Sequence, residues 1–583
     1  MTASTPPHIL FIMADQMAAP LMPMYDPQSV MQLPHLSRLA REGVRFDSAY
    51  CNSPLCAPSR FSLVSGQLPS RIGAYDNAAD LAADVPTYAH YLRNQGYRTA
   101  LSGKMHFCGP DQLHGYEERL TSDIYPADYG WAVNWDELEK RPSWYHNMSS
   151  VLQAGPCVRT NQLDFDEEVV FKARQYLYDH VRNTPAQPFC LTVSMTHPHD
   201  PYTIPAEFWD LYEGVDIPAP RHTIAQAAQD AHSQRLLKVI DLWDKPLADE
   251  AIARARRAYF GACSYIDSKV GQLLHTLEAC GLAENTIVVF SGDHGDMLGE
   301  RGLWYKMHWF EMAARVPLIV HAPGRFAAHS VAHSVSTIDL LPTFVALAGG
   351  TVQADLPLDG RSLLPHLQGS GGHDEVIGEY MAEGSKTPLF MVRRGPWKFI
   401  YSHDDMCMLY HLPSDPDELR NLAGTPAHAD TLQSFMQEVT ARWDIPALHA
   451  QVLASQRRRR EGRDQKNGEG KRTKAIKYVG EHFATPAKGE GRRRHRPAVG
   501  QRHDRGSRCD RRPLRAVARA TSGPCTWRRD LDHAVQVSGR RPRGPGRHVL
   551  GPGAAARPAG DRRQPWRLAL ARPPVPRRTR RGR

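Results

Sequence analysis

The stretch Ile9-Leu10-Phe11-Ile12-Met13-Ala14-Asp15 decides the fold, because a short apolar run is followed at once by a carboxylate. An uninterrupted run of this kind predicts a strand that is buried on both faces, as in parallel sheets. Two similar runs occur at residues 189–195 and 286–291. Each is also followed by polar residues, His197-Pro198-His199 and Gly292-Asp293-His294.

The segments between these runs have helical spacing. Helices are predicted at residues 35–42, 86–95 and 251–280, and further strands are predicted at residues 44–46, 98–101 and 316–321. Strands that alternate with helices indicate an α/β fold with a mainly parallel central sheet flanked by helices. Ligands of such sheets bind beyond the carboxyl ends of the strands. We therefore expect Asp15, the His197 cluster and Asp293 to converge on one crevice.

The pattern changes near residue 376. Short β-like segments at residues 388–392, 397–401 and 409–412 predict a small C-terminal subdomain with an antiparallel sheet. We accordingly divide the chain into a catalytic domain at 1–375, the small subdomain at 376–456 and a tail at 457–583.

The tail has a charge balance opposite to that of the body. The whole chain carries a net charge of +10, but residues 457–583 hold 38 Lys and Arg against 10 Asp and Glu. The segment is rich in Arg, Gly, Pro and Ala without apolar periodicity, so we expect it to be disordered. A natural arm that binds nucleic acid is one explanation. A reading-frame shift in a GC-rich gene is the explanation that we favour, so nucleic acid is not an expected partner.

The sequence contains no recognisable targeting segment and no apolar stretch long enough to cross a membrane. Its 10 cysteines follow no disulfide framework. We therefore expect a cytoplasmic protein with mostly unpaired thiols and no membrane partner.

The most specific motif is Cys56-Ala57-Pro58-Ser59-Arg60. This Cys-x-Pro-x-Arg pattern resembles the signature of the type I sulfatases, in the alkaline-phosphatase-like superfamily. Four other segments are similar to landmarks of that family, and the resemblance spans about residues 7 to 460. They are Ser102–His106, Ser291–Asp296, Leu358–Pro365, and Asp415–Glu418 with Asn421–Ala423.

The resemblance implies a modified nucleophile. In this family a maturation enzyme oxidises the cysteine, here Cys56, to formylglycine. One oxygen of the formylglycine hydrate attacks sulfur, and the other later helps to expel sulfate. Arg60 would steady the diol and the charge beside the metal.

The same resemblance implies a divalent metal ion. Asp15, Asp293 and His294 would be its ligands, together with formylglycine at position 56. Oxygen-rich coordination points to Ca²⁺, with Mg²⁺ and Mn²⁺ as alternatives. Gln16 stands where many sulfatases have a second Asp, and its part in metal binding is open.

The remaining catalytic roles follow by matching position. A sulfate ester is an anion, so the site needs cations, and Lys104 and Lys306 would hold the sulfate oxygens. His106 would be the base that collapses the sulfated hemiacetal. Either His197 or His199 would protonate the leaving alkoxide, and the family pattern H-x-P fits His199 better.

Long stretches resemble the choline sulfatases in particular, among them residues 53–58, 65–71 and 109–115. A quaternary ammonium group is recognised by aromatic faces, each worth roughly 0.5–2 kcal/mol, and by carboxylates. The resemblance therefore implies a choline pocket formed by Asn77, Trp131, His146 and Glu383, with Glu383 as the counter-charge.

The resemblance also implies partners. The substrate would be a small sulfate ester, the maturation enzyme would be a transient partner, and the family forms homo-oligomers in which a C-terminal extension completes a neighbour's choline pocket. A frame-shifted tail would impair this assembly. The alternatives are a related arylsulfatase, a phosphonate monoester or phosphodiester hydrolase, and a non-catalytic scaffold with a tail that binds nucleic acid.

Overall fold

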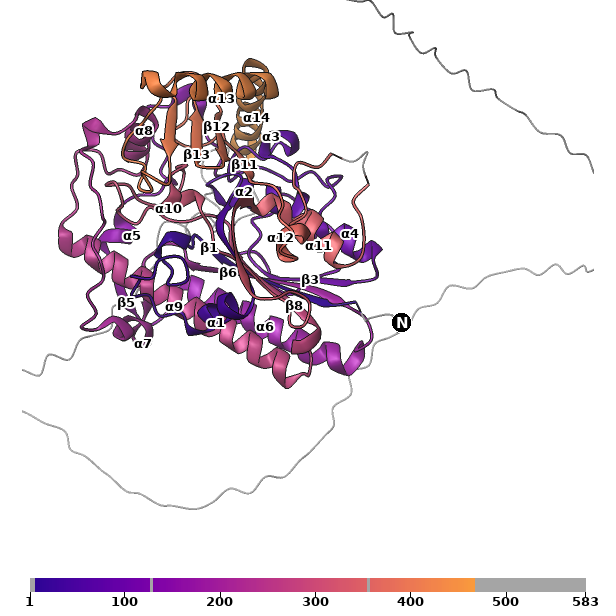
Figure 1. Cartoon of the computed structure of the whole chain (residues 1–583). Coiled ribbons are helices and arrows are strands. Elements are labelled where there is room, and N and C mark those ends of the chain that lie inside the picture. The colour runs from indigo at the N-terminus through magenta and orange to yellow at the C-terminus, as the bar shows by residue number, and fades with distance from the viewer. Residues whose placement is uncertain (1–5, 126–128, 354–356, 467–583) are drawn as a thin grey trace, which may run out of the picture. The chain divides into compact units, whose positions relative to one another are not determined.

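The computed structural model describes residues 6–125, 129–353 and 357–466, with side chains up to residue 462. Its centre is a large sheet whose strands mostly come from distant parts of the chain (Figure 1). Within the described residues the strands follow each other in space as β10 (His329–Ser336), β2 (Val44–Tyr50), β9 (Leu318–His321), β8 (Thr286–Gly292), β1 (His8–Asp15), β6 (Phe189–Pro198), β3 (Arg98–Gly103) and β4 (Glu118–Arg119).

The middle of this sheet is parallel. β1 lies between β8 and β6, and β3 pairs with the other side of β6, all in the parallel sense. Every residue of β1, β6 and β8 is buried, because helices cover both faces. The prediction of a mainly parallel α/β sheet is confirmed. β9, from the run predicted at residues 316–321, is antiparallel to both of its neighbours.

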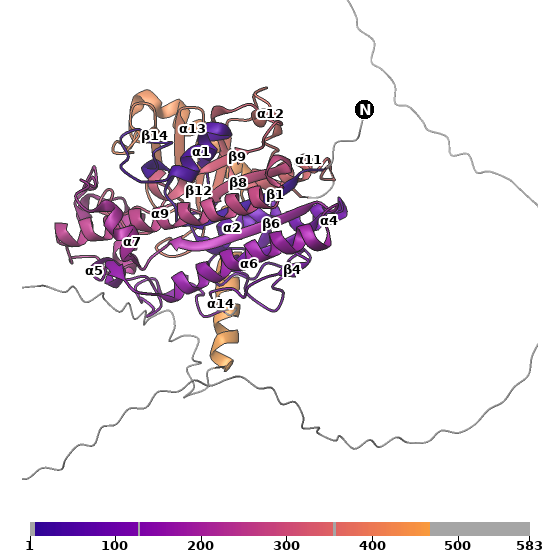
Figure 2. The same cartoon turned by 90° about the horizontal axis from the view of Figure 1, so that it is seen from below.

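Helices pack on the two faces of the sheet. α6 and α9 run along one face, while α2, α4 and α11 lie against the other (Figures 1 and 2). The described helices are α1 (Pro34–Glu42), α2 (Cys56–Ser65), α3 (Pro69–Ile72), α4 (Tyr88–Asn94), α5 (Ser149–Leu152), α6 (Asn161–Asn183), α7 (Ala206–Trp209), α8 (Ala231–Val239), α9 (Asp249–Ala279), α10 (Glu311–Ala314), α11 (Leu340–Leu347), α12 (Leu364–Leu367), α13 (Ala429–Arg442) and α14 (Ile445–Lys466). In the part of the chain that the structure describes, no helix is both long and apolar enough to cross a membrane.

A second, antiparallel sheet follows, as predicted. Its strands are β11 (Glu375–Tyr380), β12 (Leu389–Arg394), β13 (Trp397–Tyr401) and β14 (Met408–His411), in that order. Of these strands, β11 was not predicted from the sequence. Helix α13 covers this sheet. A short parallel pair, β5 (Gly155–Cys157) and β7 (Thr203–Pro205), lies outside both sheets.

Helix α14 runs through the boundary that we predicted at residue 456. It continues to Lys466, so the first part of the predicted tail is helical rather than disordered. The physical reason is that three arginines beyond the boundary form ion pairs with carboxylates of the body: Arg459 pairs with Asp76, and Arg457 and Arg460 both pair with Asp136. The rest of the predicted tail, residues 467–583, lies outside the described residues, and its disorder stays a prediction.

Candidate active site

Four neighbouring parallel strands bring their carboxyl ends together. Asp293 follows β8, Asp15 ends β1, His199 follows β6 and Lys104 follows β3. Between β1 and β6 the pairing register shifts at this edge, where Asp15 lies opposite Pro198. Side chains from four separate parts of the sequence therefore meet in one buried site.

Cys56 enters this site from the first turn of α2, whose residues are all buried. The first turn of a helix leaves backbone amides without partners. Here the amide of Ala57 donates to Oδ1 of Asn77 at 3.0 Å, and Pro58 has no amide hydrogen. Asn77 thus acts as a cap from outside the helix and fixes the turn that carries Cys56, a role that the sequence analysis did not predict.

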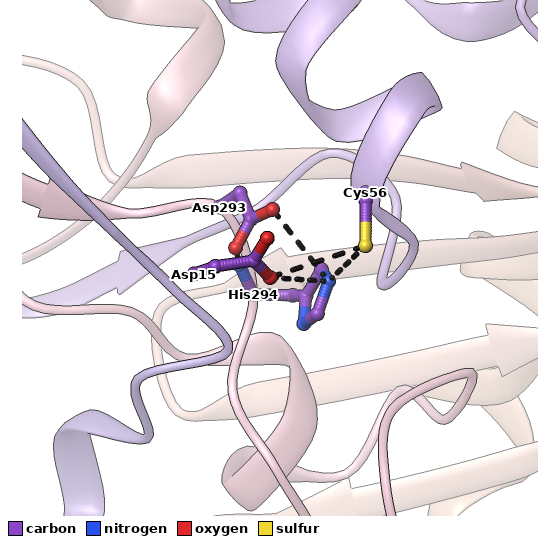
Figure 3. Close-up of side chains that lie close together, drawn as sticks. All are labelled: Asp15, Cys56, Asp293 and His294. Carbon is purple, nitrogen blue, oxygen red and sulfur yellow. Dashed lines mark hydrogen bonds and ion pairs between the residues drawn. The ribbon is translucent and has the colours of Figure 1, made fainter. Parts of the chain in front are cut away.

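Cys56, Asp15, Asp293 and His294 form a compact group of potential metal ligands (Figure 3). Cys56 Sγ lies 3.1 Å from His294 Nε2 and 4.0 Å from Asp15 Oδ1. His294 Nε2 lies 3.7 Å from Asp293 Oδ2 and 3.8 Å from Asp15 Oδ1. The ring nitrogen Nδ1 of His294 lies 3.0 Å from the carbonyl oxygen of Gly295, so Nδ1 carries the proton and Nε2 offers its lone pair to the group. Two carboxylates and an oriented imidazole are suited to hold a divalent cation.

Arg60 ties the strand ends together beneath this group. Its Nε donates to Asp293 Oδ2 at 2.8 Å and its Nη2 donates to Asp15 Oδ2 at 3.2 Å. Its Nη1 donates to the carbonyl of Lys104 at 2.7 Å and to Ser194 Oγ at 2.8 Å. The guanidinium is completely buried, and it is compensated by the two carboxylates. These contacts favour a role for Arg60 in holding Asp15 and Asp293 in place, in addition to the expected role of steadying the diol.

Lys104 reaches the site because of the glycine before it. Gly103 has a φ of +113°, and a Cβ there would lie 2.0 Å from the carbonyl oxygen of Ser194. Lys104 Nζ pairs with Asp15 Oδ2 and lies 4.3 Å from the ring centroid of Tyr125. Burial alone would raise the pKa of Asp15, but Lys104, with further cations around it, holds that pKa well below its usual range. Asp15 is therefore a carboxylate that can bind a metal.

Lys306 and His199 form a second part of the site. Lys306 Nζ lies 2.6 Å from His199 Nε2 and donates to Gln16 Oε1 at 2.7 Å. The side-chain nitrogen Nε2 of Gln16 donates to Asp296 Oδ2 at 2.7 Å. The side chain of Gln16 is thus engaged away from the four-residue ligand group. Burial, together with Lys306, lowers the pKa of His199 well below its ordinary value.

His197 is oriented differently from His199. Its Nδ1 lies 2.6 Å from Asp166 Oδ2, on α6, and its ring packs edge-on against Tyr265, on α9. His199 is the histidine that meets Lys306. These contacts favour His199 over His197 as the residue near the leaving group.

Aromatic side chains line the approach to the buried site. The ring of Trp131 lies 5.5 Å from that of His106 and 4.9 Å from that of Tyr125, between ring centroids. His106 Nε2 lies 3.1 Å from the carbonyl oxygen of Asn77. Trp131 and Tyr125 are both partly exposed. Tyr125 was not among the predicted residues, since no spacing in the sequence marks it.

The other two predicted pocket residues are His146 and Glu383. His146 stacks on Tyr305, with centroids 4.7 Å apart, and its Nδ1 lies 3.5 Å from Asp200 Oδ2 beside His199. Glu383 is 5% exposed. Burial raises the pKa of Glu383 to about 7, a shift that the charge of Asp76 increases and that of Lys306 opposes.

A buried ion pair beside Asn77 was not predicted from the sequence. Arg459, on α14, binds Asp76 through both terminal nitrogens, with Nη2 at 2.9 Å from Oδ2. Asp76 is completely buried and also accepts from the amide of Ala78 at 3.0 Å. A run of four arginines gave no indication of which one is buried.

The fold and the site fit a class of hydrolase that acts on anionic esters with a divalent metal, because buried cations and potential metal ligands surround one cysteine. The family model described as Sulfatase matches residues 7–350, and a model described as N-sulphoglucosamine sulphohydrolase, C-terminal, matches residues 299–443. The chain belongs to the sulfatase family and is a sulfuric ester hydrolase. Membership implies a metal and formylglycine, and the four-residue ligand group fits both.

Individual relatives support this assignment. The chain is 47% identical over 462 residues to a choline-sulfatase of Rhizobium meliloti, covering 78% of this chain and 90% of that protein. It is 27% identical to an N-acetylglucosamine-6-O-sulfatase of Bacteroides thetaiotaomicron, covering 74% of this chain and 85% of the relative. Among solved structures, the phosphonate monoester hydrolase of Agrobacterium radiobacter shares the fold, with a TM-score of 0.61, 20% identity, and 77% and 96% of the two chains covered.

Proposed function

We propose that the protein hydrolyses choline sulfate to choline and sulfate. The observation that carries the proposal is the 47% identity to a protein named choline-sulfatase, which extends over 90% of that relative. A second observation supports it: the partly exposed rings of Tyr125 and Trp131 lie beside Lys104 and His106, and the buried carboxylate of Glu383 lies close enough to Lys306 for their charges to interact. Aromatic faces and a carboxylate are the groups that recognise a quaternary ammonium ion.

Water cleaves the ester between sulfur and oxygen, which yields an alcohol, sulfate and a proton. Formylglycine at position 56 would supply the oxygen nucleophile. Lys306 and Lys104 would neutralise the sulfate. Nδ1 of His199 lies 2.7 Å from the carbonyl oxygen of Asp200, so its Nε2 accepts from Lys306 Nζ at 2.6 Å, and the Lys306–His199 pair would together deliver a proton to the departing choline oxygen. His106, held at 3.1 Å from the carbonyl of Asn77, would take up the proton that releases sulfate.

We propose Ca²⁺ as the metal of the mature enzyme, held by Asp15, Asp293, His294 and the oxygen at position 56. Hard oxygen ligands favour Ca²⁺. The imidazole of His294 keeps Mn²⁺ as an alternative, and Mg²⁺ is a third. Metal-free enzyme reloaded with each cation in turn will rank them by turnover and by thermal stabilisation.

The remaining parts of the proposal concern the surroundings of the enzyme. No disulfide bond joins cysteines within the described residues, which favours a reducing compartment such as the cytoplasm. Maturation requires an enzyme that converts Cys56. We also propose self-assembly, as the family resemblance implies, and expect it to be weak if the tail is frame-shifted. Light scattering of the full chain measures that assembly.

The test has two steps. The mass of the peptide that carries Cys56 is first measured after co-production with a formylglycine-generating enzyme, and conversion lowers it by about 18 Da. Converted protein is then given choline sulfate, an aryl sulfate and a phosphonate monoester. We expect the highest kcat/KM for choline sulfate. A clear preference for the aryl sulfate or the phosphonate ester contradicts the proposal and favours the corresponding rival.

A further inference from the structure

The unconverted chain carries a sulfur donor inside its metal site. Cys56 is 1% exposed, and Sγ faces His294 Nε2 at 3.1 Å (Figure 3). Asp15 turns Oδ2 toward Lys104 and Arg60, which leaves Oδ1 facing the sulfur at 4.0 Å. One thiol, one imidazole and two carboxylates therefore point toward a common centre.

The spacing of these donors matches a small tetrahedral ion. Zn²⁺ binds nitrogen and oxygen at about 2.0 Å and thiolate sulfur at about 2.3 Å, so neighbouring donors of a tetrahedral site lie roughly 3.3–3.8 Å apart. The separations that involve His294 Nε2 are 3.1 Å to sulfur and 3.7 and 3.8 Å to the carboxylate oxygens. Small shifts of these side chains would complete the geometry.

The same donors suit Ca²⁺ poorly while Cys56 is a thiol. Ca²⁺ takes about 6–8 oxygen ligands at 2.3–2.6 Å, whereas thiolate and imidazole select softer ions. The nearest additional oxygen ligand by sequence would be Gln16. Its Oε1 already accepts from Lys306 at 2.7 Å.

The orientation of His294 is already that of a zinc ligand. Its Nδ1 is tied to the carbonyl of Gly295 at 3.0 Å, which leaves Nε2 as the metal-binding nitrogen. Arg60 fixes Asp293 through Oδ2 at 2.8 Å and also contacts Asp15. Since these hydrogen bonds orient the ligand atoms toward one another, binding would need little reorganisation.

We propose that the unconverted protein binds Zn²⁺ through Cys56, His294, Asp15 and Asp293. Once Cys56 is converted, a hard cation replaces Zn²⁺ in this site. Zinc displaces the thiol proton, which goes to solvent, and forms a zinc–sulfur bond without any redox change. Conversion removes the sulfur and with it the preference for zinc. The inference rests on the proposed function only in assuming that Cys56 is the position that is converted.

The test uses the full chain produced without a maturation enzyme, with the unmodified thiol verified by mass and the metal removed by a chelator. Zn²⁺ affinity is measured by competition with a chromophoric chelator. We expect Cys56→Ala to weaken the tightest Zn²⁺ site by about 100-fold or more. Cys51→Ala is the matched control, because Cys51 is equally buried but lies outside the ligand group, and we expect less than a threefold change.

Two further readouts identify the donor. Co²⁺ in place of Zn²⁺ should give a thiolate-to-metal charge-transfer absorption band in the parent and in Cys51→Ala. The band should be absent from Cys56→Ser, which replaces the sulfur by oxygen and changes the volume of the side chain little. Zinc should also slow alkylation of Cys56. Equal Zn²⁺ affinity in the parent and Cys56→Ala, or a cobalt band that survives in Cys56→Ser, overturns the inference.

The outcomes separate this inference from the proposed function. If converted protein hydrolyses choline sulfate but the unconverted chain shows no thiolate band, only the zinc site is refuted. If the band is present but converted protein does not hydrolyse choline sulfate, only the proposed substrate is refuted. Converted protein should lose the band and bind Zn²⁺ at least tenfold more weakly than the unconverted chain.

Discussion

Replacing Arg459 by glutamine tests whether α14 belongs to the catalytic body. The substitution leaves the carboxylate of Asp76 buried and without its cationic partner. Breaking a buried pair in this way costs about 3–5 kcal/mol. The unfolding entropy is about 2 cal/mol/K per residue, so for a body the size of residues 6–466 a loss of 1 kcal/mol in the free energy of unfolding lowers Tm by about 1 °C. We expect Tm to fall by about 3–5 °C.

The same substitution should reduce activity through Asn77. Asp76 precedes Asn77, which caps the turn of Cys56 through Ala57 and accepts from His106. Displacement of these groups should lower kcat/KM on the order of tenfold. The assay combines differential scanning fluorimetry with turnover of converted protein. The control is Arg457→Gln on the same helix, which breaks only an exposed pair with Asp136 and should change both readouts much less.

A double variant shows whether the lost charge balance is the cause. Asp76→Asn combined with Arg459→Met removes both charges, so the uncompensated carboxylate disappears. We expect the double variant to be more stable than Arg459→Gln alone. The reasoning is refuted if Arg459→Gln and Arg457→Gln shift Tm equally, or if the double variant is less stable than Arg459→Gln alone.

Two further predictions concern the substrate. Because burial raises the pKa of Glu383 to about 7, its carboxylate forms only as the pH rises through that value; KM for choline sulfate should therefore increase as the pH falls below 7, by at most about tenfold per pH unit. Glu383→Gln should raise KM for choline sulfate and flatten this pH profile. KM for a sulfate ester with an uncharged aryl group should stay nearly unchanged. A pH profile that keeps its slope in the variant contradicts the assignment of Glu383. His199→Ala should slow the hydrolysis of choline sulfate by about 10²–10⁴-fold. It should slow the hydrolysis of 4-nitrophenyl sulfate far less, since a good leaving group needs no proton. His197→Ala, which removes the partner of Asp166, should instead lower Tm without distinguishing the two esters.

The sequence predicted the central sheet well because its signal is local. The buried runs around β1, β6 and β8 are continuous and apolar, and each ends in the polar residues that later meet at the site. The antiparallel sense of β9 was not predictable, because a short apolar run says nothing about direction. β11 was not predicted because its six residues, Glu375–Tyr380, include two glutamates and a glycine and so form no continuous apolar run.

The sequence indicated which residues meet at the strand ends, but it did not indicate the contacts between their side chains. His197 and His199 lie at the same strand end, and only the position of Asp166 on α6 shows which ring turns away from Lys306. The contacts of Arg60 with two carboxylates likewise depend on the parallel order of β1 and β8. Pair contacts between residues more than a hundred positions apart leave no trace in one sequence.

The position of Cys56 depends on support that comes from the whole length of the body. Asn77 caps the helix turn that carries it, and Ser59 in the same helix donates to the backbone of Asp293 at 2.6 Å. Arg459, at the far end of the described chain, anchors the residue that precedes Asn77. Since a shift of about 1 Å at a nucleophile can cost on the order of 100-fold in rate, this distant arginine belongs to the requirements of the active site. A truncation before α14 should therefore impair catalysis even though every metal ligand remains.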